Sequence, residues 1–215
     1  MKFEFKAAIF DMDGTLLDSM RYWRLGCLEY LLAHNLPVPD EILMQTFQSP
    51  TTRLVMRALE ILGIEGDRDA IWGEIRERMR RRYVEDVKPK AFVREYLDQL
   101  RAADVKMCIA TASPQDYANI AFARHGLHGH FAFITGEEGV GATKHEPEFF
   151  EKVVAKLGVP PEDCVVFEDA LYAIKTAKRA GLRVCAIEDG TAHHDREEIQ
   201  SIADRYITGF DELLI

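Results

Sequence analysis

The sequence predicts an α/β protein with a doubly wound, mainly parallel sheet and an inserted helical domain. Short apolar runs that end abruptly in polar residues alternate with helix-like stretches, a pattern typical of buried parallel strands in βαβ units. Between Ser19 and Glu85, roughly sixty residues show only helical patterning, which is far too many for an ordinary connection. The inserted segment therefore indicates a second domain.

The strands and helices of the core can be assigned along the chain. Five apolar runs are predicted as strands: 7–10, 107–110, 131–134, 164–167 and 184–187. Four amphipathic stretches between them are predicted as helices: 92–103, 115–125, 147–157 and 171–180. Strands and helices that alternate in this way imply right-handed crossovers.

The inserted segment is predicted as a helical cap domain over residues 18–87, with residues 1–17 and 88–215 forming the Rossmann-like core. Leucines recur at helical spacing around 25–32 and 54–62, and residues 68–83 form a long charged helix. The hinges are expected near Asp18 and Lys88-Pro89.

The composition of the chain limits which binding partners and which cellular location can be expected. The chain has 215 residues, 47% hydrophobic composition and a formal net charge of −9, which argues against nucleic acid as a partner. Its four cysteines are not closely spaced and are expected to be reduced core thiols. No apolar run has the length of a membrane span or the form of a signal segment, so we expect no membrane partner and a cytoplasmic protein.

Polar residues at the ends of different strands are expected to meet at one edge of the sheet. These residues are Asp11, Asp13, Thr111, Glu168 and Asp169. Carboxylates about 4 Å apart repel by roughly 4 kcal/mol per pair at an effective dielectric near 20, so a positive group must lie among them. Oxygen ligands alone favour a hard cation, and Mg²⁺ suits such a site better than Zn²⁺.

Asp11 and Asp13 can divide the labour of phosphoryl transfer. One carboxylate can attack phosphorus while the other protonates the leaving oxygen and then activates water. Lys144 is the candidate cation that offsets the charge of the phosphate. The hydroxyl of Thr111 could bind a phosphate oxygen or merely cap the next helix, and Ser113 is a weaker candidate for the same role.

Four motifs together carry a resemblance to a known family. In chain order they are Asp11-Met12-Asp13-Gly14-Thr15, Ile109-Ala110-Thr111-Ala112-Ser113, Lys144 with Pro147 and Phe150, and Phe167-Glu168-Asp169-Ala170. The chain resembles a haloacid dehalogenase superfamily phosphatase of the β-phosphoglucomutase-like group, which has a Rossmann-like core and a helical cap.

The resemblance implies a role for each matched residue. Asp11 would be the nucleophile and Asp13 the acid and base, while Thr111, Ala112 and Lys144 would bind phosphate. Magnesium would be held by Asp11, the main-chain carbonyl of Asp13, and Asp169, with Glu168 beside it.

The chain also departs from the family in places that bear on the substrate. Trp23 stands where the related mutases place a histidine in the first cap helix, which weakens a mutase interpretation. His145 replaces a common proline, and the segment Gln48-Ser49-Pro50-Thr51-Thr52 lacks the usual glycine. Trp23 and Arg53 are the candidate substrate contacts of the cap.

We therefore expect a magnesium-dependent phosphohydrolase that cleaves a small phosphorylated metabolite, such as a sugar or polyol phosphate, through an aspartyl-phosphate. The alternatives are a phosphomutase of the β-phosphoglucomutase type and a non-catalytic phosphoacceptor or binding protein. We expect a monomer, with a dimer as the alternative.

Overall fold

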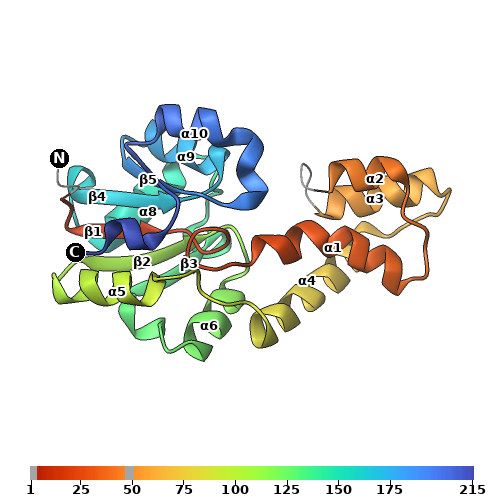
Figure 1. Ribbon diagram of the computed structural model, residues 1–215, viewed down its shortest axis with the longest axis horizontal. Helices are drawn as coiled ribbons and strands as arrows, with labels where there is room; N and C mark the ends of the chain where they lie inside the picture. Colours follow the sequence, from red (N-terminus) through yellow and green to blue (C-terminus); the bar gives the residue numbers. More distant parts are fainter. Residues whose placement is uncertain (1–3, 47–50) are drawn as a thin grey trace. The chain divides into compact units, whose positions relative to one another are not determined.

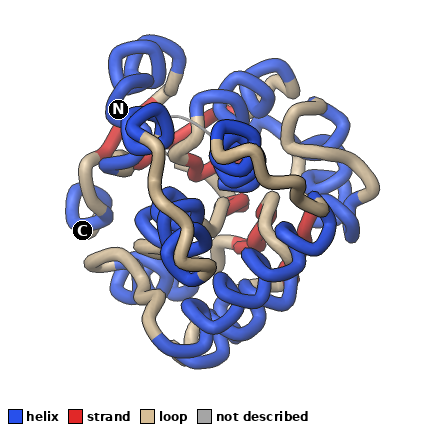
Figure 2. The backbone as a smooth tube through the Cα atoms, turned by 90° about the vertical axis from the view of Figure 1, so that its right-hand side faces the viewer, coloured by secondary structure: helices blue, strands red, loops and turns tan. Residues whose placement is uncertain are grey.

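The chain folds into two compact units. The computed structural model describes residues 4–46 and 51–215. Met1–Asp18 and Lys88–Ile215 form one unit, called here the core unit, and Ser19–Val87 form the helical unit. The described strands, red in Figure 2, all belong to the core unit. Asp18, which the sequence analysis placed in the cap, groups with the core unit, where its amide donates to the carbonyl of Lys88 at 2.9 Å.

The core unit is built on one parallel sheet (Figure 1). The strands are β1 Ala7–Phe10, β2 Lys106–Thr111, β3 Phe133–Gly136, β4 Cys164–Glu168, β5 Arg183–Ile187 and β6 Arg205–Ile207. Their order is β3-β2-β1-β4-β5-β6, and each neighbouring pair is parallel. The chain first builds outward on one side of β1 and then returns to build on the other, so the predicted doubly wound sheet is confirmed.

Helices cover both faces of this sheet. On one face, alternate strand residues such as Ile9 and Val166 pack into a single cluster with α8 Pro147–Leu157, α9 Leu171–Arg179 and α10 Arg196–Ile202. On the other face lie α5 Val93–Ala102 and α6 Gln115–Arg124. There the ring of Tyr96 on α5 lies 5.8 Å from that of Phe167 on β4. Strands buried on both faces explain why their sequences are continuous apolar runs.

Several elements differ from the sequence prediction. Strand β3 begins at Phe133 rather than at residue 131, because Phe131 is the buried end of the short turn His128–His130. Strand β6, helix α10 and the four-residue helix α7 Glu137–Val140 were not predicted. The remaining 3-10 turns are Pro161–Asp163, Gly190–Asp195 and Phe210–Leu213.

The helical unit contains four helices in its described residues. They are α1 Met20–Ala33, α2 Asp40–Gln45, α3 Thr51–Ile61 and α4 Arg68–Glu85. Helix α1 packs against both α3 and α4. The side chain of Asp67 caps α4 by accepting hydrogen bonds from the amides of Asp69 and Ala70. Residues 48–50 of the segment singled out as a substrate loop lie outside the described residues.

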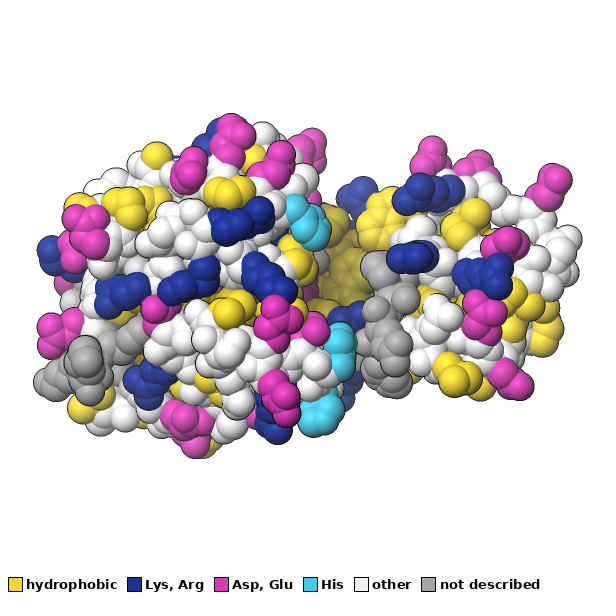
Figure 3. Space-filling model, turned by 90° about the horizontal axis from the view of Figure 1, so that it is seen from above, with side chains coloured by type: hydrophobic (Ala, Val, Ile, Leu, Met, Phe, Trp, Pro, Cys, Tyr) yellow, Lys and Arg dark blue, Asp and Glu magenta, His cyan; other side chains and the backbone are white. Residues whose placement is uncertain are grey.

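The charged surface and the buried cysteines of the structure are those expected from the composition of the chain. Acidic and basic side chains are interspersed over the face of the core unit seen in Figure 3. Ion pairs such as that of Lys178 with Asp204 join oppositely charged side chains of the core unit. All four cysteines are buried free thiols, as predicted. Among the described residues, no helix has both the length and the apolar character that a membrane span requires.

Candidate active site

The loop after β1 carries two of the predicted catalytic residues. Asp11 directly follows the strand, and its amide donates to the carbonyl of Phe167 at 2.9 Å, which extends the pairing of β1 with β4. Gly14 then adopts a left-handed conformation with φ 84°, which costs other residues about 1–2 kcal/mol. The amides of Leu16 and Leu17 both bond back to the carbonyl of Met12. The resulting tight turn keeps Asp13 beside the end of the sheet.

Three carboxylates meet at this end of the sheet. Asp11, Glu168 and Asp169 each offer an oxygen atom, and these atoms lie within 4.8 Å of one another. The residues are 6%, 1% and 4% exposed. Asp11 directly follows β1 whereas Glu168 is the last residue of β4, so adjacent strands bring together residues that are far apart in sequence.

Lys144 supplies the positive charge of this cluster. It lies on the loop between α7 and α8 and is 1% exposed. Its ammonium nitrogen is 2.5 Å from Asp11 Oδ1 and 2.8 Å from Glu168 Oε2. Its main-chain amide donates to Glu137 Oε1 at 2.8 Å, which ties the loop to α7. Lys144 is therefore a buried member of the site and not a surface lysine.

The buried charges shift each other's pKa values. Burial alone would lower the pKa of Lys144, but the charges of Asp11 and Glu168 outweigh it and hold the pKa above its usual range. Burial and the charge of Asp11 raise the pKa of Glu168 to about 7 despite the nearby ammonium. Burial, Glu168 and Asp11 also raise the pKa of Asp169 well above its usual value. When all are ionised, three carboxylates and one ammonium leave two negative charges.

Hydrogen bonds orient the acidic pair. Glu168 Oε1 accepts bonds from the amides of Asp169 and Ala170, at 3.2 and 3.1 Å. The hydroxyl of Thr15 donates to Asp169 Oδ1 at 3.2 Å. The sequence analysis quoted Thr15 within its motif without a role, because a single buried hydroxyl leaves no pattern in the sequence.

The loop after β2 reaches Asp13. The hydroxyl of Ser113 donates to Asp13 Oδ2 at 2.6 Å, and the amide of Ser113 donates to Thr111 Oγ1 at 3.0 Å. Ala112 lies between them and is exposed. Ser113, which sequence reasoning considered only for phosphate binding, is thus placed to orient the carboxylate of Asp13.

The two candidate substrate contacts of the cap lie in the helical unit. Trp23, on α1, donates from Nε1 to the hydroxyl of Tyr83 at 3.0 Å, and its ring stacks on that of Trp72 with centroids 6.3 Å apart. Arg53, on α3, is exposed. Their contact with a substrate stays a prediction.

Comparison with known proteins identifies the family. Residues 8–187 match the family model of haloacid dehalogenase-like hydrolases. The chain belongs to this family. A fructose-1-phosphate phosphatase of Escherichia coli is 30% identical to it, over 81% of the chain and 92% of the relative. A phosphorylated carbohydrates phosphatase of Thermotoga maritima is 28% identical, over 87% of the chain and 89% of the relative. The resemblance drawn from the motifs is confirmed.

Solved structures of the family share the fold. A β-phosphoglucomutase-like protein of Thermotoga maritima aligns with a TM-score of 0.77 and 26% identity, and the match covers 94% of each chain. The phosphate complex of CbbY from Rhodobacter sphaeroides also gives 0.77, with 23% identity over 97% of this chain and 96% of that one. Together with the phosphatases among its relatives, family membership makes the chain a hydrolase of phosphoric monoesters.

The acidic cluster of this haloacid dehalogenase-like hydrolase fits a divalent metal. Phosphatases of the family generally use one, and here the three clustered carboxylates provide only hard oxygen ligands. The cluster carries two excess negative charges when its carboxylates are ionised, and burial together with the repulsion between these charges raises the pKa values of Glu168 and Asp169. Asp11, Glu168 and Asp169 therefore fit a hard divalent cation.

A divalent cation in this cluster should raise the free energy of unfolding, and more so at neutral than at acid pH. The pKa of Glu168 is raised in the folded chain, so its destabilising charge develops as pH rises from the unfolded value near 4 towards about 7. An ion that binds only the folded chain, present at about 100 times its Kd, adds about 2.7 kcal/mol to the free energy of unfolding. We expect a rise in Tm of roughly 5 to 10 °C over chelator at pH 7.5 and a smaller rise at pH 5.5, as measured by calorimetry. Equal stability in Mg²⁺ and chelator at both pH values would contradict the assignment of the site.

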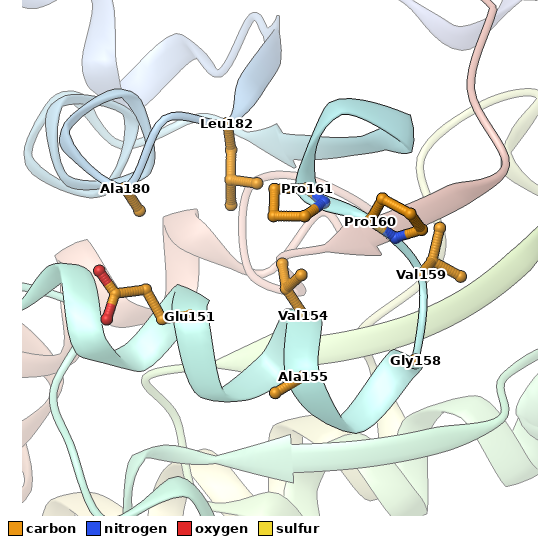
Figure 4. Close-up of a pocket in the computed structure, with 9 residues that line it drawn as sticks. All are labelled: Glu151, Val154, Ala155, Gly158, Val159, Pro160, Pro161, Ala180 and Leu182. Atoms are coloured by element: carbon orange, nitrogen blue, oxygen red, sulfur yellow. The ribbon is translucent and has the colours of Figure 1, made fainter.

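A pocket separate from the acidic cluster lies at the amino ends of strands β4 and β5. Its volume is about 510 Å³, and it is formed beside α8 by the segments that precede β4 and β5 (Figure 4). The lining residues are Glu151, Val154, Ala155, Gly158, Val159, Pro160, Pro161, Ala180 and Leu182. Glu151 is the single ionisable side chain in this lining, so the pocket lacks the charged groups that the chemistry at Asp11 would need.

Proposed function

We propose that the chain is a magnesium-dependent phosphatase of small phosphorylated sugars or polyols and that Asp11 is its nucleophile. The observation that carries the proposal is the buried contact of Lys144 with Asp11 and Glu168, beside Asp169. It combines a carboxylate, a cation and a metal-binding pair at the carboxyl end of a parallel sheet, where ligands of such sheets bind.

Asp11 and Asp13 would carry the covalent steps. An oxygen of Asp11 attacks phosphorus and forms an acyl phosphate, while the bond from phosphorus to the ester oxygen breaks. Asp13 gives its proton to the departing oxygen, so the alcohol leaves neutral. Asp13 then takes a proton from water, which attacks the acyl phosphate and releases inorganic phosphate and free Asp11.

Other residues would hold the phosphate and the metal. Lys144 would bind a phosphate oxygen, and Thr111 would donate its hydroxyl, since that hydroxyl oxygen already accepts from the amide of Ser113. Ala112 would contribute through the backbone of the same loop. Magnesium would be held by Asp11, the main-chain carbonyl of Asp13, and Asp169, with Glu168 beside it, and its charge would offset that of the phosphate.

The substrate class rests on the relatives. The Escherichia coli relative is named for fructose-1-phosphate and the Thermotoga maritima relative for phosphorylated carbohydrates. Another relative, from Streptomyces hygroscopicus, is a validoxylamine A 7'-phosphate phosphatase at 27% identity. We infer that this chain acts on a phosphorylated polyhydroxy compound, with Trp23 and Arg53 as the side chains of the helical unit that would select it.

Phosphate release from a panel of esters tests the proposal. The panel contains sugar phosphates, polyol phosphates, nucleotides and p-nitrophenyl phosphate, each with Mg²⁺ and with chelator. We expect release that requires Mg²⁺ and is fastest with a sugar or polyol phosphate. Isomerisation of a sugar phosphate that depends on a bisphosphate activator would support the mutase alternative. Silence across the panel, with phosphate still bound, would support a non-catalytic binding protein.

A further inference from the structure

Helix α9 contacts the loop that carries Lys144 at two points on one residue, His145. The ring of Tyr172 stacks on the His145 ring with centroids 4.4 Å apart and an interplanar angle of 25°. The guanidinium of Arg179 donates to the main-chain carbonyl of His145 at 2.7 Å. Both the side chain and the backbone of the residue after Lys144 are thereby held by the same helix.

The contacts come from one face of α9. Residues 172, 176 and 179 are spaced i, i+4 and i+7, which places them above one another on a helix. Thr176 links the two ends, because its hydroxyl donates to the carbonyl of Tyr172 at 2.9 Å and accepts from Arg179 at 2.9 Å. Tyr172 and Arg179 therefore act on His145 from a single rigid surface.

The same helix begins at the acidic pair. Helix α9 starts at Leu171, with Ala170 alone between it and Asp169. Its position is thus fixed relative to the carboxylate of Glu168, which lies 2.8 Å from the ammonium of Lys144. Because α9 begins two residues after Asp169 and contacts both the ring and the carbonyl of His145, it sets the distance between the lysine loop and the acidic residues.

The charges of the acidic cluster and of Lys144 also influence the pKa of Tyr172. Burial raises the pKa of its hydroxyl, the ammonium of Lys144 opposes this, and the charge of Glu168 adds to it. The residue as a whole is nevertheless 39% exposed. Tyr172 thus lies beside the cluster as well as against the loop.

We propose that Tyr172 and His145, with Arg179, are positioning residues that hold the Lys144 ammonium in register with Asp11 and Glu168. The proposal rests on the proposed function, in which Lys144 binds the phosphate. An error of about 1 Å in placing such a group can cost about 100-fold in rate. The stack therefore contributes to turnover through Lys144 without touching the reacting atoms.

Two substitutions that break the stack test this inference. Tyr172→Ala and His145→Ala should each lower kcat by about 10- to 100-fold and weaken binding of inorganic phosphate, measured by calorimetry in Mg²⁺ buffer, by about 10-fold. Mg²⁺ affinity and Tm should change little, because the metal-binding carboxylates stay in place. The double variant should have a kcat no lower than that of the less active single variant, since each substitution removes the same Tyr172–His145 contact.

Two further variants serve as controls. Tyr172→Phe keeps the ring and should restore near wild-type kcat and phosphate affinity. Lys175 also lies on α9, but its ion pair with Glu198 on α10 is not part of the contact with His145. Lys175→Ala should therefore leave kcat and phosphate affinity unchanged. The inference is overturned if Tyr172→Ala and His145→Ala keep wild-type kcat and phosphate affinity. It is also overturned if Tyr172→Phe loses kcat to the same extent, or if the loss of kcat is accompanied by an equal loss of Mg²⁺ affinity.

The readouts separate this inference from the proposed function. If the wild-type protein cleaves no ester in the panel, the proposed function fails, and phosphate binding alone decides whether the stack positions Lys144. If the wild-type protein cleaves esters but the stack variants match it, the proposed function stands and the positioning role is rejected.

Discussion

Asp11→Asn is expected to abolish turnover, with kcat reduced by at least about 10⁴-fold. Asparagine has nearly the shape of aspartate but lacks the charged oxygen that attacks phosphorus. The structure adds a reason to expect a folded variant. Asp11 is one of three crowded acidic residues, and Lys144 keeps its contact with Glu168 at 2.8 Å when the charge of Asp11 is removed. The measurement is phosphate release from the best ester of the panel, with Tm recorded alongside.

Trapping the phosphoenzyme sharpens this test. Acid quenching of the wild-type protein during turnover should leave a phosphoryl group on the peptide that contains Asp11, and the variant should show none. Asp163→Asn is a suitable control, because Asp163 pairs with Lys6 and is not part of the acidic cluster. Its activity should stay within about twofold of wild type. A label on another peptide, or substantial turnover by Asp11→Asn, would remove Asp11 as the nucleophile.

The elements that sequence patterning predicted best are those buried on both faces of the sheet. Strand β1 was predicted with its observed bounds, because a strand in the centre of a parallel sheet must be apolar throughout. Strand β6 was missed, since Arg205-Tyr206-Ile207 is a three-residue edge strand with a polar start. Phe131 was wrongly placed in a strand because apolar character alone does not distinguish a strand residue from a buried turn residue.

The site was predictable only where strand ends determine it. Asp11, Glu168 and Asp169 lie at the carboxyl ends of β1 and β4, so the topology of a parallel sheet is enough to bring them together. Lys144 lies on a loop, and no periodicity indicates where a loop side chain points, so its assignment needed the family motif. The contacts of Ser113 with Asp13, and of Tyr172 with His145, depend on side-chain geometry that single-sequence reasoning does not reach.

Lys144→Met is expected to damage both stability and catalysis. Methionine fills a similar volume but leaves Asp11 and Glu168 buried without their shared cation. Removal of one partner from a buried ion pair typically costs about 3–5 kcal/mol, so denaturation in chelator should show a loss of this size. The kcat should fall by at least about 10³-fold, because no ammonium remains to stabilise the transferring phosphoryl group. Lys178→Met, which removes a surface ion pair with Asp204, should cost at most about 1 kcal/mol.

The response of the Lys144→Met variant to Mg²⁺ distinguishes an electrostatic role from simple packing. When all three carboxylates are ionised, as binding of a divalent cation requires, loss of the ammonium leaves three negative charges instead of a net two, so the cluster should bind the cation more tightly than in the wild-type protein. Mg²⁺ should therefore raise the Tm of the variant by more than it raises that of wild type, while activity stays low because the phosphate has lost its partner. A smaller Mg²⁺ effect in the variant would mean that Lys144 supports the cluster by filling space, and its role as the charge that balances Asp11 and Glu168 would be rejected.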